Sequence, residues 1–458
     1  MKKNKLFPLL VFTFLLFSCG TQKKVSEAQE TPEYSANTST TSTIEKPVLN
    51  LGFLKLTDMA PLAIAIEKGY FEGEGLFVVL KAQSNWRHIF DRVVDGQLDG
   101  AQMLAGQPIA ASVGFGRQAE LVTLLSTGLN GNAITINNEI WASMKPHVIS
   151  DNNGKPIHPI SAKALQTVIE SYRDNGKPFK MGIEYPVSGS NYEIRYWLAA
   201  AGIHPGLYSK ENVQGQINSE VLLSVCPTPQ MPAVLESGTV YGYSAGEPWN
   251  TTSVLKSIGV PVTTNYDIRK NGPNKVFVMS KKFVEKYPNT AVAVTKALIR
   301  AAKWLDNPKN HEEAIEILAL PQYVGANESV LENAITGTFE FEKGAIRDMP
   351  DFNVFYDNHA TYPFYSDGIW FLTQMRRWGQ IPSSKPAAWY HKTIKDIYRP
   401  DIWVKAANSL LKEGHLKASE IPTTDGYKSA SKDFIDKKEY NGKNPIEYLN
   451  SFNIGNKD

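Results

Sequence analysis

The sequence predicts an α/β protein made of two blocks of alternating strands and helices, followed by a helical region. In the first block, an apolar strand at 48–53, a helix after Pro61 and a second strand at 76–81 follow one another. The second block begins near Leu129 with a strand at 133–137. Such alternation is typical of a parallel sheet flanked by helices. Two blocks therefore predict two α/β lobes.

The stretch 180–205 is the most informative part of the second block. A strand at 180–185 is expected to stop at Pro186, and a helix to open at Ser190 or Asn191, both good N-caps, and to end at Gly202. The first turn of such a helix points free backbone N–H groups into the preceding loop, which suits a small anion. An ordinary capped helix is the alternative interpretation.

The later part of the chain returns to the first block and then becomes helical. A strand at 275–279 is expected to recross to the first lobe, and helices are predicted at 289–306, 312–319, 328–338 and 365–378. Within the last helix and at its end, the aromatic residues are interpreted as core rather than as ligand contacts: Trp370, Phe371 and Trp378. Beyond residue 423 the chain is polar and lysine-rich, so we expect it to be loosely held.

Composition and the N-terminal residues indicate the class of protein and its location. The 458 residues carry a net charge of +2 and are 42% hydrophobic, which predicts a large globular core and no nucleic-acid partner. A basic start followed by an apolar run at 6–17 is typical of an export signal and too short to span a membrane.

Residues 16–20, Leu-Phe-Ser-Cys-Gly, resemble the cleavage site of bacterial lipoproteins. This resemblance implies a signal peptide at 1–18 and lipid on Cys19; a plain secretory peptide is the alternative. Residues 19–46 are polar and predicted to be a disordered tether. Cys226 would then be the only thiol left and a buried apolar residue, with no disulfide possible.

Several motifs resemble the nitrate/bicarbonate-binding components of ABC transporters. They span about 47–403 and lie at 56–62, 67–71, 194–203, 229–231, 246–250, 362–363, 370–372 and 377–379. The resemblance implies a type II periplasmic-binding-protein fold with two lobes, a hinge, a ligand cleft and a helical C-terminal part. It also implies these boundaries: the first part of lobe 1 at 47–128, lobe 2 at 129–278, the return to lobe 1 and the helical part at 279–422, and a polar tail at 423–458.

The same resemblance implies a set of ligand-binding residues. Trp86, Gly246 and Lys275 match the family's binding tryptophan, backbone-contact glycine and cation, whereas Asn132 and Asn191 replace the glutamine and histidine of nitrate binders. An anion taken out of water needs a counter-charge and several donors. The predicted site is therefore Trp86, Asn132, Gly189, Ser190, Asn191, Gly246 and Lys275.

No metal or cofactor is predicted at this site. The family's bicarbonate binders place a carboxylate where Lys275 stands and use calcium, and a lysine there would repel the ion. Glu247 is a weak candidate metal ligand, with a structural hydrogen-bond acceptor as the alternative. The sequence also carries no Gly-x-Ser-x-Gly elbow, no paired histidines and no nucleotide-binding glycine loop, which favours a binding protein over an enzyme.

The expected function is capture of a small inorganic oxyanion, nitrate or nitrite, and delivery to ABC permease and ATPase subunits. The protein is expected to be a monomer outside the cytoplasm, lipid-anchored to a membrane, and periplasmic in a Gram-negative cell. Three alternatives stay open: bicarbonate, a small organic ligand such as a sulfonate or a pyrimidine precursor, and a ligand-sensing lipoprotein.

Overall fold

The structure is a computed structural model and describes residues 43–456 except 213, 214 and 218. Residues 43–458 form one compact unit, which contains two five-stranded sheets. The predicted signal peptide at 1–18, Cys19 and most of the predicted tether lie outside the described residues. Within those residues, no helix is both long and apolar enough to cross a membrane.

Lobe 1, as the name is used below, is the sheet β2-β1-β3-β11-β4 with the helices packed on it. Strands β1, β2 and β3 run parallel, whereas β11 lies antiparallel to β3 and β4. The bounds are β1 Val48–Phe53, β2 Phe77–Ala82, β3 Gly100–Leu104, β4 Leu121–Ser126 and β11 Lys275–Ser280. Because β11 follows every strand of the second sheet in sequence, the predicted recrossing near residue 275 is confirmed.

Lobe 2 is the sheet β10-β6-β9-β7-β8 with its helices. Strands β7, β8 and β9 run parallel, but β6 lies antiparallel to β9 and β10. The bounds are β6 Asn132–Asn137, β7 Phe179–Ile183, β8 Val221–Val225, β9 Gly242–Gly246 and β10 Gly259–Thr264. The expectation of parallel sheets is therefore wrong in part. The strands next to the points where the chain crosses between lobes, β6 and β11, run antiparallel to their neighbours.

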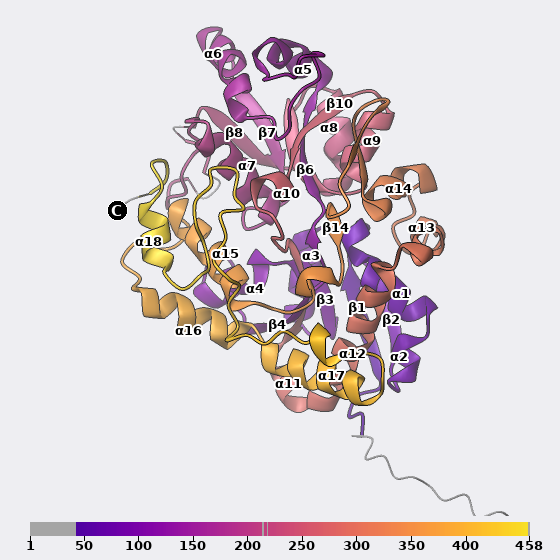
Figure 1. The fold of residues 1–458 in the computed structure, drawn as a ribbon. Coiled ribbons are helices and arrows are strands. Elements are labelled where there is room, and N and C mark those ends of the chain that lie inside the picture. Colours follow the sequence, from indigo (N-terminus) through magenta and orange to yellow (C-terminus); the bar gives the residue numbers. More distant parts are fainter. Residues whose placement is uncertain (1–42, 213–214, 218, 457–458) are drawn as a thin grey trace, which may run out of the picture. The chain divides into compact units, whose positions relative to one another are not determined.

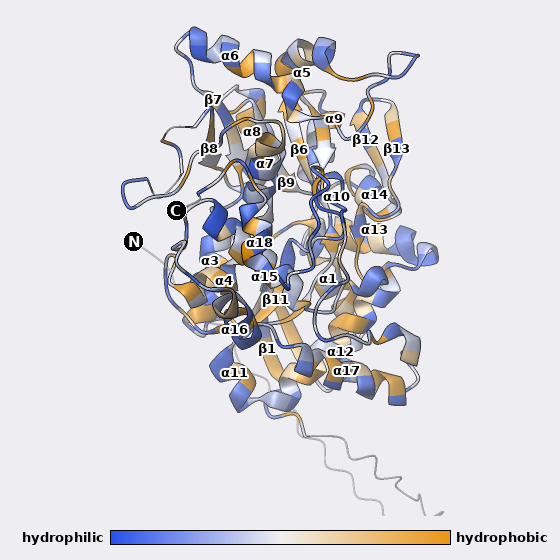
Figure 2. Ribbon diagram, turned by 60° about the vertical axis from the view of Figure 1, so that its left-hand side comes forward, coloured by the Kyte–Doolittle hydropathy of each residue, from blue (hydrophilic) through white to orange (hydrophobic). Residues whose placement is uncertain are grey.

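Helices cover both sheets, which lie one above the other in Figure 1. Those associated with lobe 1 are α1 Ala60–Glu67, α2 Tyr70–Gly73, α3 Trp86–Val94, α4 Gly106–Val113, α11 Lys281–Lys286, α12 Pro288–Leu305, α13 His311–Ala319 and α17 Pro400–Lys412. Those associated with lobe 2 are α5 Asn138–Met144, α6 Gln166–Asp174, α7 Gly189–Ala200, α8 Met231–Glu236, α9 Trp249–Leu255, α10 Asn265–Ile268 and α14 Glu328–Thr336. Figure 2 shows hydrophobic residues along β1 and β11 and hydrophilic ones over much of α6.

Helix α7 begins slightly earlier than the sequence predicted. Ser188 has an extended backbone and is the N-cap, and its hydroxyl accepts a hydrogen bond from the N–H of Asn191 at 3.0 Å. The predicted caps, Ser190 and Asn191, are therefore wrong, because both already lie in the first turn. Gly202, with a φ of +87°, ends the helix as expected.

Helix α15 (Tyr365–Arg377) lies between the two lobes and carries the predicted aromatic core. It packs on α4 and on α16 (Ala387–Ile397), while the ring of Trp370 meets that of Tyr192 from α7 edge-on at 6.2 Å. Trp370, Phe371 and Trp378 are fully buried, which confirms their core role. The sequence did not predict the hairpin of β12 Thr338–Glu342 and β13 Ala345–Asp348, or the pair of β5 Leu129–Asn130 with β14 Asn353–Val354.

The C-terminal tail is packed, so the expectation that it is loosely held is wrong. Phe434, Tyr448 on α18 (Pro445–Asn450) and Phe452 are each about 5% exposed and form ring contacts with Tyr196 of α7 or with one another. Arg377 lies over the ring of Phe452 at 3.7 Å. The aromatic residues spaced among the lysines supply the apolar area that holds the tail in place.

Replacing Phe434 with alanine tests whether the tail belongs to the core. We expect Phe434→Ala to lower the free energy of unfolding by about 3 kcal/mol, because a buried ring is lost and a cavity remains. Urea denaturation followed by fluorescence measures this change. Lys432→Ala, whose side chain is 67% exposed, is the control and should change stability little. Equal stability of the two variants would contradict the packed tail.

Candidate functional site

A buried ammonium group lies where the two lobes meet. Lys275, the first residue of β11, is 1% exposed and reaches from lobe 1 toward lobe 2. Its Nζ donates a hydrogen bond to Asn132 Oδ1 at 2.8 Å and lies 3.0 Å from Asp58 Oδ2 and 3.9 Å from Glu184 Oε2. Asp58 comes from the 3₁₀ turn Thr57–Met59 of lobe 1, whereas Asn132 and Glu184 belong to lobe 2.

Asn132 connects this lysine to a second buried carboxyl group. Its Nδ2 donates to Glu193 Oε2 on α7 at 3.1 Å, and its backbone N–H donates to Asn265 Oδ1 at 3.0 Å. Asn132 is therefore held from three sides and cannot rotate without breaking the contact to Lys275 or the contact to Glu193.

The site has one cation and several carboxyl groups, and burial dominates the proton affinity of each acid. Burial raises the pKa of Asp58 and of Glu184, although the positive charge of Lys275 opposes it in both cases. Burial likewise raises the pKa of Glu193 to about 6, against the hydrogen bond from Asn132. Burial alone would lower the pKa of Lys275, but Asp58, Glu184 and Glu193 together raise it above its usual value, so the lysine stays charged.

Gly246 at the end of β9 lets the peptide backbone approach this group. A Cβ built on Gly246 would lie 3.0 Å from Lys275 Nζ and 3.1 Å from Asp58 Oδ2, so any larger side chain would push the pair apart. Glu247 follows it; its Oε2 accepts from the N–H of Thr251 at 3.1 Å, and its carbonyl accepts from Thr57 N across the lobes at 3.0 Å. Burial raises the pKa of Glu247 to about 7.

Trp86 begins α3 and offers a free hydrogen-bond donor. Its side chain is 2% exposed, and its indole N–H is among the described buried groups without a hydrogen-bond partner. Gln107 of α4 fixes the tryptophan backbone by donating to Trp86 O at 2.7 Å while accepting from the N–H of Leu104. A buried donor without a partner is unfavourable, so this N–H is a natural contact for a bound molecule.

The loop before α7 is used differently from the way the sequence suggested. The hydroxyl of Ser190 contacts that of Ser188 at 2.8 Å, and the side chain of Asn191 accepts from Arg195 and donates to Pro186 O. Gly189 packs against Asn274, whose Oδ1 would lie 1.6 Å from an added Cβ. The structure thus brings Asn132, Gly246 and Lys275 together, while it engages the side chain of Asn191 inside lobe 2.

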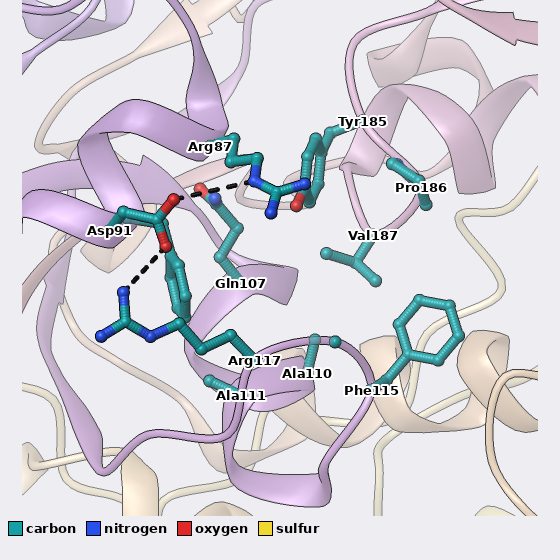
Figure 3. Close-up of a pocket in the computed structure, with 12 residues that line it drawn as sticks. Arg87, Asp91, Gln107, Ala110, Ala111, Phe115, Arg117, Tyr185, Pro186 and Val187 are labelled. Atoms are coloured by element: carbon teal, nitrogen blue, oxygen red, sulfur yellow. Dashed lines mark hydrogen bonds and ion pairs between the residues drawn. The ribbon is translucent and has the colours of Figure 1, made fainter. Parts of the chain in front are cut away.

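A cavity of about 170 Å³ lies along the same boundary between lobes. Figure 3 shows Gln107 and Phe115 on the lobe 1 side and Tyr185 and Val187 on the lobe 2 side. The carboxylate of Asp91 forms ion pairs with two arginines at its rim, Arg87 at 3.7 Å and Arg117 at 3.1 Å. Gln107, which lines the cavity, is also the residue that binds the Trp86 backbone.

Sequence reasoning missed three of the groups at Lys275: Asp58, Glu184 and Glu193. Asp58 stands in a motif that carried the family resemblance, but only as a helix start. Glu184 directly follows the apolar strand β7, and Glu193 lies among apolar residues of a buried helix. An acid in such a position is the signal that the sequence offered. Among the described residues no three histidine, cysteine, aspartate or glutamate side chains are grouped so that they could hold a metal ion.

Two α/β lobes with a charged group buried between them define a two-lobed binding protein of the periplasmic-binding-protein fold. The model of the NMT1-like family matches residues 42–319, and the chain belongs to this family. A crystal structure of the periplasmic nitrate-binding protein NrtA from Synechocystis PCC 6803 superposes with a TM-score of 0.78 and 27% identity. The match covers 90% of this chain and 100% of that one.

Several curated proteins are also similar to this chain. The nitrate/nitrite binding protein NrtA of Nostoc sp. is 29% identical over 92% of this chain and 89% of its own length. The nitrate import ATP-binding protein NrtC of Synechocystis sp. is 35% identical over 80% of this chain, and the bicarbonate transport ATP-binding protein CmpC of the same organism is 31% identical over 89%. The match spans about half of each of these two: 51% of NrtC and 55% of CmpC. All three relatives are named as transport or binding components.

The raised pKa of Glu247 predicts how stability depends on pH. The folded chain holds this proton up to about pH 7, whereas an unfolded glutamate has its ordinary pKa of 4.5, so stability falls as pH rises between these values. Glu247→Gln should reduce that fall by about 3 kcal/mol, the equivalent of the shift. Urea denaturation at pH 4.5 and pH 8 measures it.

The control for this measurement is Glu72→Gln, since Glu72 is an exposed glutamate of α2. It should leave the pH dependence of the wild type unchanged. If Glu247→Gln shows the same fall in stability as the wild type, Glu247 ionises without cost and its burial has no thermodynamic effect.

Proposed function

We propose that this chain is the solute-binding component of an ABC importer and that it captures a small oxyanion, nitrate or nitrite, between its lobes. The observation that carries the proposal is the charged, buried Lys275 at the boundary between lobes, in a chain that resembles nitrate-binding proteins over most of its length. A buried cation supplies the counter-charge that a dehydrated monovalent anion requires.

The donors around Lys275 suit an oxyanion. The unpaired indole N–H of Trp86 supplies a further donor, and Gly246 allows the backbone to approach closely. Asn132 holds the lysine in place. The amides at the start of α7, near Gly189 and Ser190, add the positive end of a helix dipole. Asn191 takes part by shaping this loop through Pro186 O.

Closure of the lobes controls access to this site. Lys275, Asn132 and Gly246 are all buried, so a ligand enters only when lobe 2 moves away from lobe 1. The ligand-bound, closed form is then the shape that permease and ATPase subunits recognise. In this proposal the protein acts as an extracytoplasmic monomer, periplasmic in a Gram-negative cell and held to a membrane by lipid on Cys19.

Bicarbonate is the second candidate ligand. The CmpC relatives are named as bicarbonate transport proteins, and bicarbonate is also a small planar anion that could pair with Lys275. Lys275 itself opposes a calcium ion at the same place. Titration with and without calcium distinguishes the two candidates.

Isothermal titration calorimetry of the purified protein with sodium nitrate tests the proposal. We expect the wild type to bind nitrate without calcium. Lys275→Met should weaken binding at least about 100-fold, because removal of one partner from a buried charge pair costs about 3–5 kcal/mol. Circular dichroism checks that the variant is folded.

Lys392→Met is the matched control, since Lys392 also pairs with an aspartate but its side chain is 77% exposed. This variant should bind as the wild type does. Near-normal nitrate binding by Lys275→Met would remove Lys275 from the site. If the protein binds bicarbonate with calcium and does not bind nitrate under any condition, bicarbonate is the ligand in place of nitrate.

The lipid anchor has a separate test. Replacement of Cys19 by serine removes the only sulfur that the lipoprotein motif offers, so the protein should move from the membrane fraction to the soluble fraction after cell lysis. Immunoblotting of the two fractions measures this. Cys226→Ser, at the buried thiol of lobe 2, is the control and should leave the protein in the membrane fraction. Persistent membrane association of Cys19→Ser would mean that another segment is the anchor.

A further inference from the structure

Lys275 already has a negative partner in this structure, and that partner comes from its own lobe. Asp58 Oδ2 lies 3.0 Å from Lys275 Nζ, and both residues belong to lobe 1. Glu184 is farther away, at 3.9 Å, and belongs to lobe 2 together with Asn132. When the lobes separate, Asn132 and Glu184 leave with lobe 2, whereas Asp58 remains beside the lysine. The open cleft therefore presents an ion pair rather than a free cation.

The Asp58 carboxylate has the shape and charge of the proposed ligand. Carboxylate and nitrate are both planar groups that spread one negative charge over oxygen atoms. Asp58 Oδ2 is held by charge, since it is one of the described buried atoms without a well-aligned hydrogen bond, whereas Asn132 makes such a bond to Lys275. Asp58 thus stands beside the lysine as its close charge partner, at 3.0 Å.

The ammonium group of Lys275 balances only one negative charge at this position. The other titratable groups that face Lys275 and Asp58 are acids, Glu184, Glu193 and Glu247. Arg269 lowers the pKa of Glu193, but its own ion pair is with Asp367. A second anion next to an ionised Asp58 would leave one ammonium against two negative charges in a site closed to water. Such an arrangement is strongly unfavourable. An anion can replace the charge of Asp58 but not add to it.

We propose that Asp58 is the resident counter-ion of Lys275 and that an anion takes its place, so that each anion bound brings one proton into the cleft. The proton comes from solvent and forms an O–H bond on the Asp58 carboxyl, while the ligand pairs with the ammonium; no other bond changes. Asp58 thereby lowers the affinity of the site for every anion, since each anion must compete with it for the ammonium group. This inference rests on the proposed function.

The test is calorimetry with sodium nitrate between pH 5.5 and pH 8.5, in buffers with different heats of ionisation, which counts protons taken up per nitrate. The wild type should take up about one proton and lose up to about tenfold in affinity for each pH unit. Asp58→Asn keeps the shape but removes the charge. It should bind nitrate at pH 8 at least about tenfold more tightly, take up almost no proton, and show little pH dependence.

Asp396→Asn is the control, because Asp396 pairs with Lys392 on the exposed face of α16, and it should match the wild type. Nitrate binding by the wild type without proton uptake would overturn the inference whatever the variant does, and leave the proposed function intact. Unchanged proton uptake by a folded Asp58→Asn protein would also overturn it. If neither protein binds nitrate or nitrite at any pH, the proposed function itself fails.

Discussion

One buried ammonium group organises the boundary between the two lobes. Lys275 lies close to two buried carboxyl groups, 3.0 Å from Asp58 and 3.9 Å from Glu184, and donates a hydrogen bond to Asn132 of the other sheet. Removing such a charge from water is costly, and acids of both lobes offset that cost: Asp58 of lobe 1 and Glu184 of lobe 2. Several other features depend on this group: the glycine at 246, the rigid amide of Asn132, and the cross-lobe contact from Thr57 to Glu247.

Much of the architecture could be predicted from the sequence, because strand and helix periodicities are local. The two lobes, the return of the chain near residue 275 and the aromatic core of α15 all followed from apolar patterns. Strand direction did not, since a period of two is the same in parallel and antiparallel strands. The packed tail was missed because three aromatic residues are diluted among lysines.

The site was predicted in part, and the missing part has a common cause. The resemblance to known binding proteins named Asn132, Gly246 and Lys275, which the structure places in contact. It did not name Asp58, Glu184 and Glu193, because acids far apart in sequence reveal their shared burial only once the chain has folded. The hydrogen bonds of Asn191 could not be predicted either: its side chain donates to Pro186 O and accepts from Arg195, both within lobe 2.

The C-terminal tail also touches the segment through which the chain crosses between lobes. The N–H of Lys270 donates to Asp433 O, and that of Ile435 donates to Ile268 O, so residues 433–435 run alongside the connection that leads into β11. Together with the isolated bridge between Arg269 and Phe434, these hydrogen bonds tie the tail to the connection, so that bending the connection must also move or detach the tail. Residues 433–435 therefore oppose bending of the connection between the lobes, although they contribute no side chain to the described contacts of Lys275.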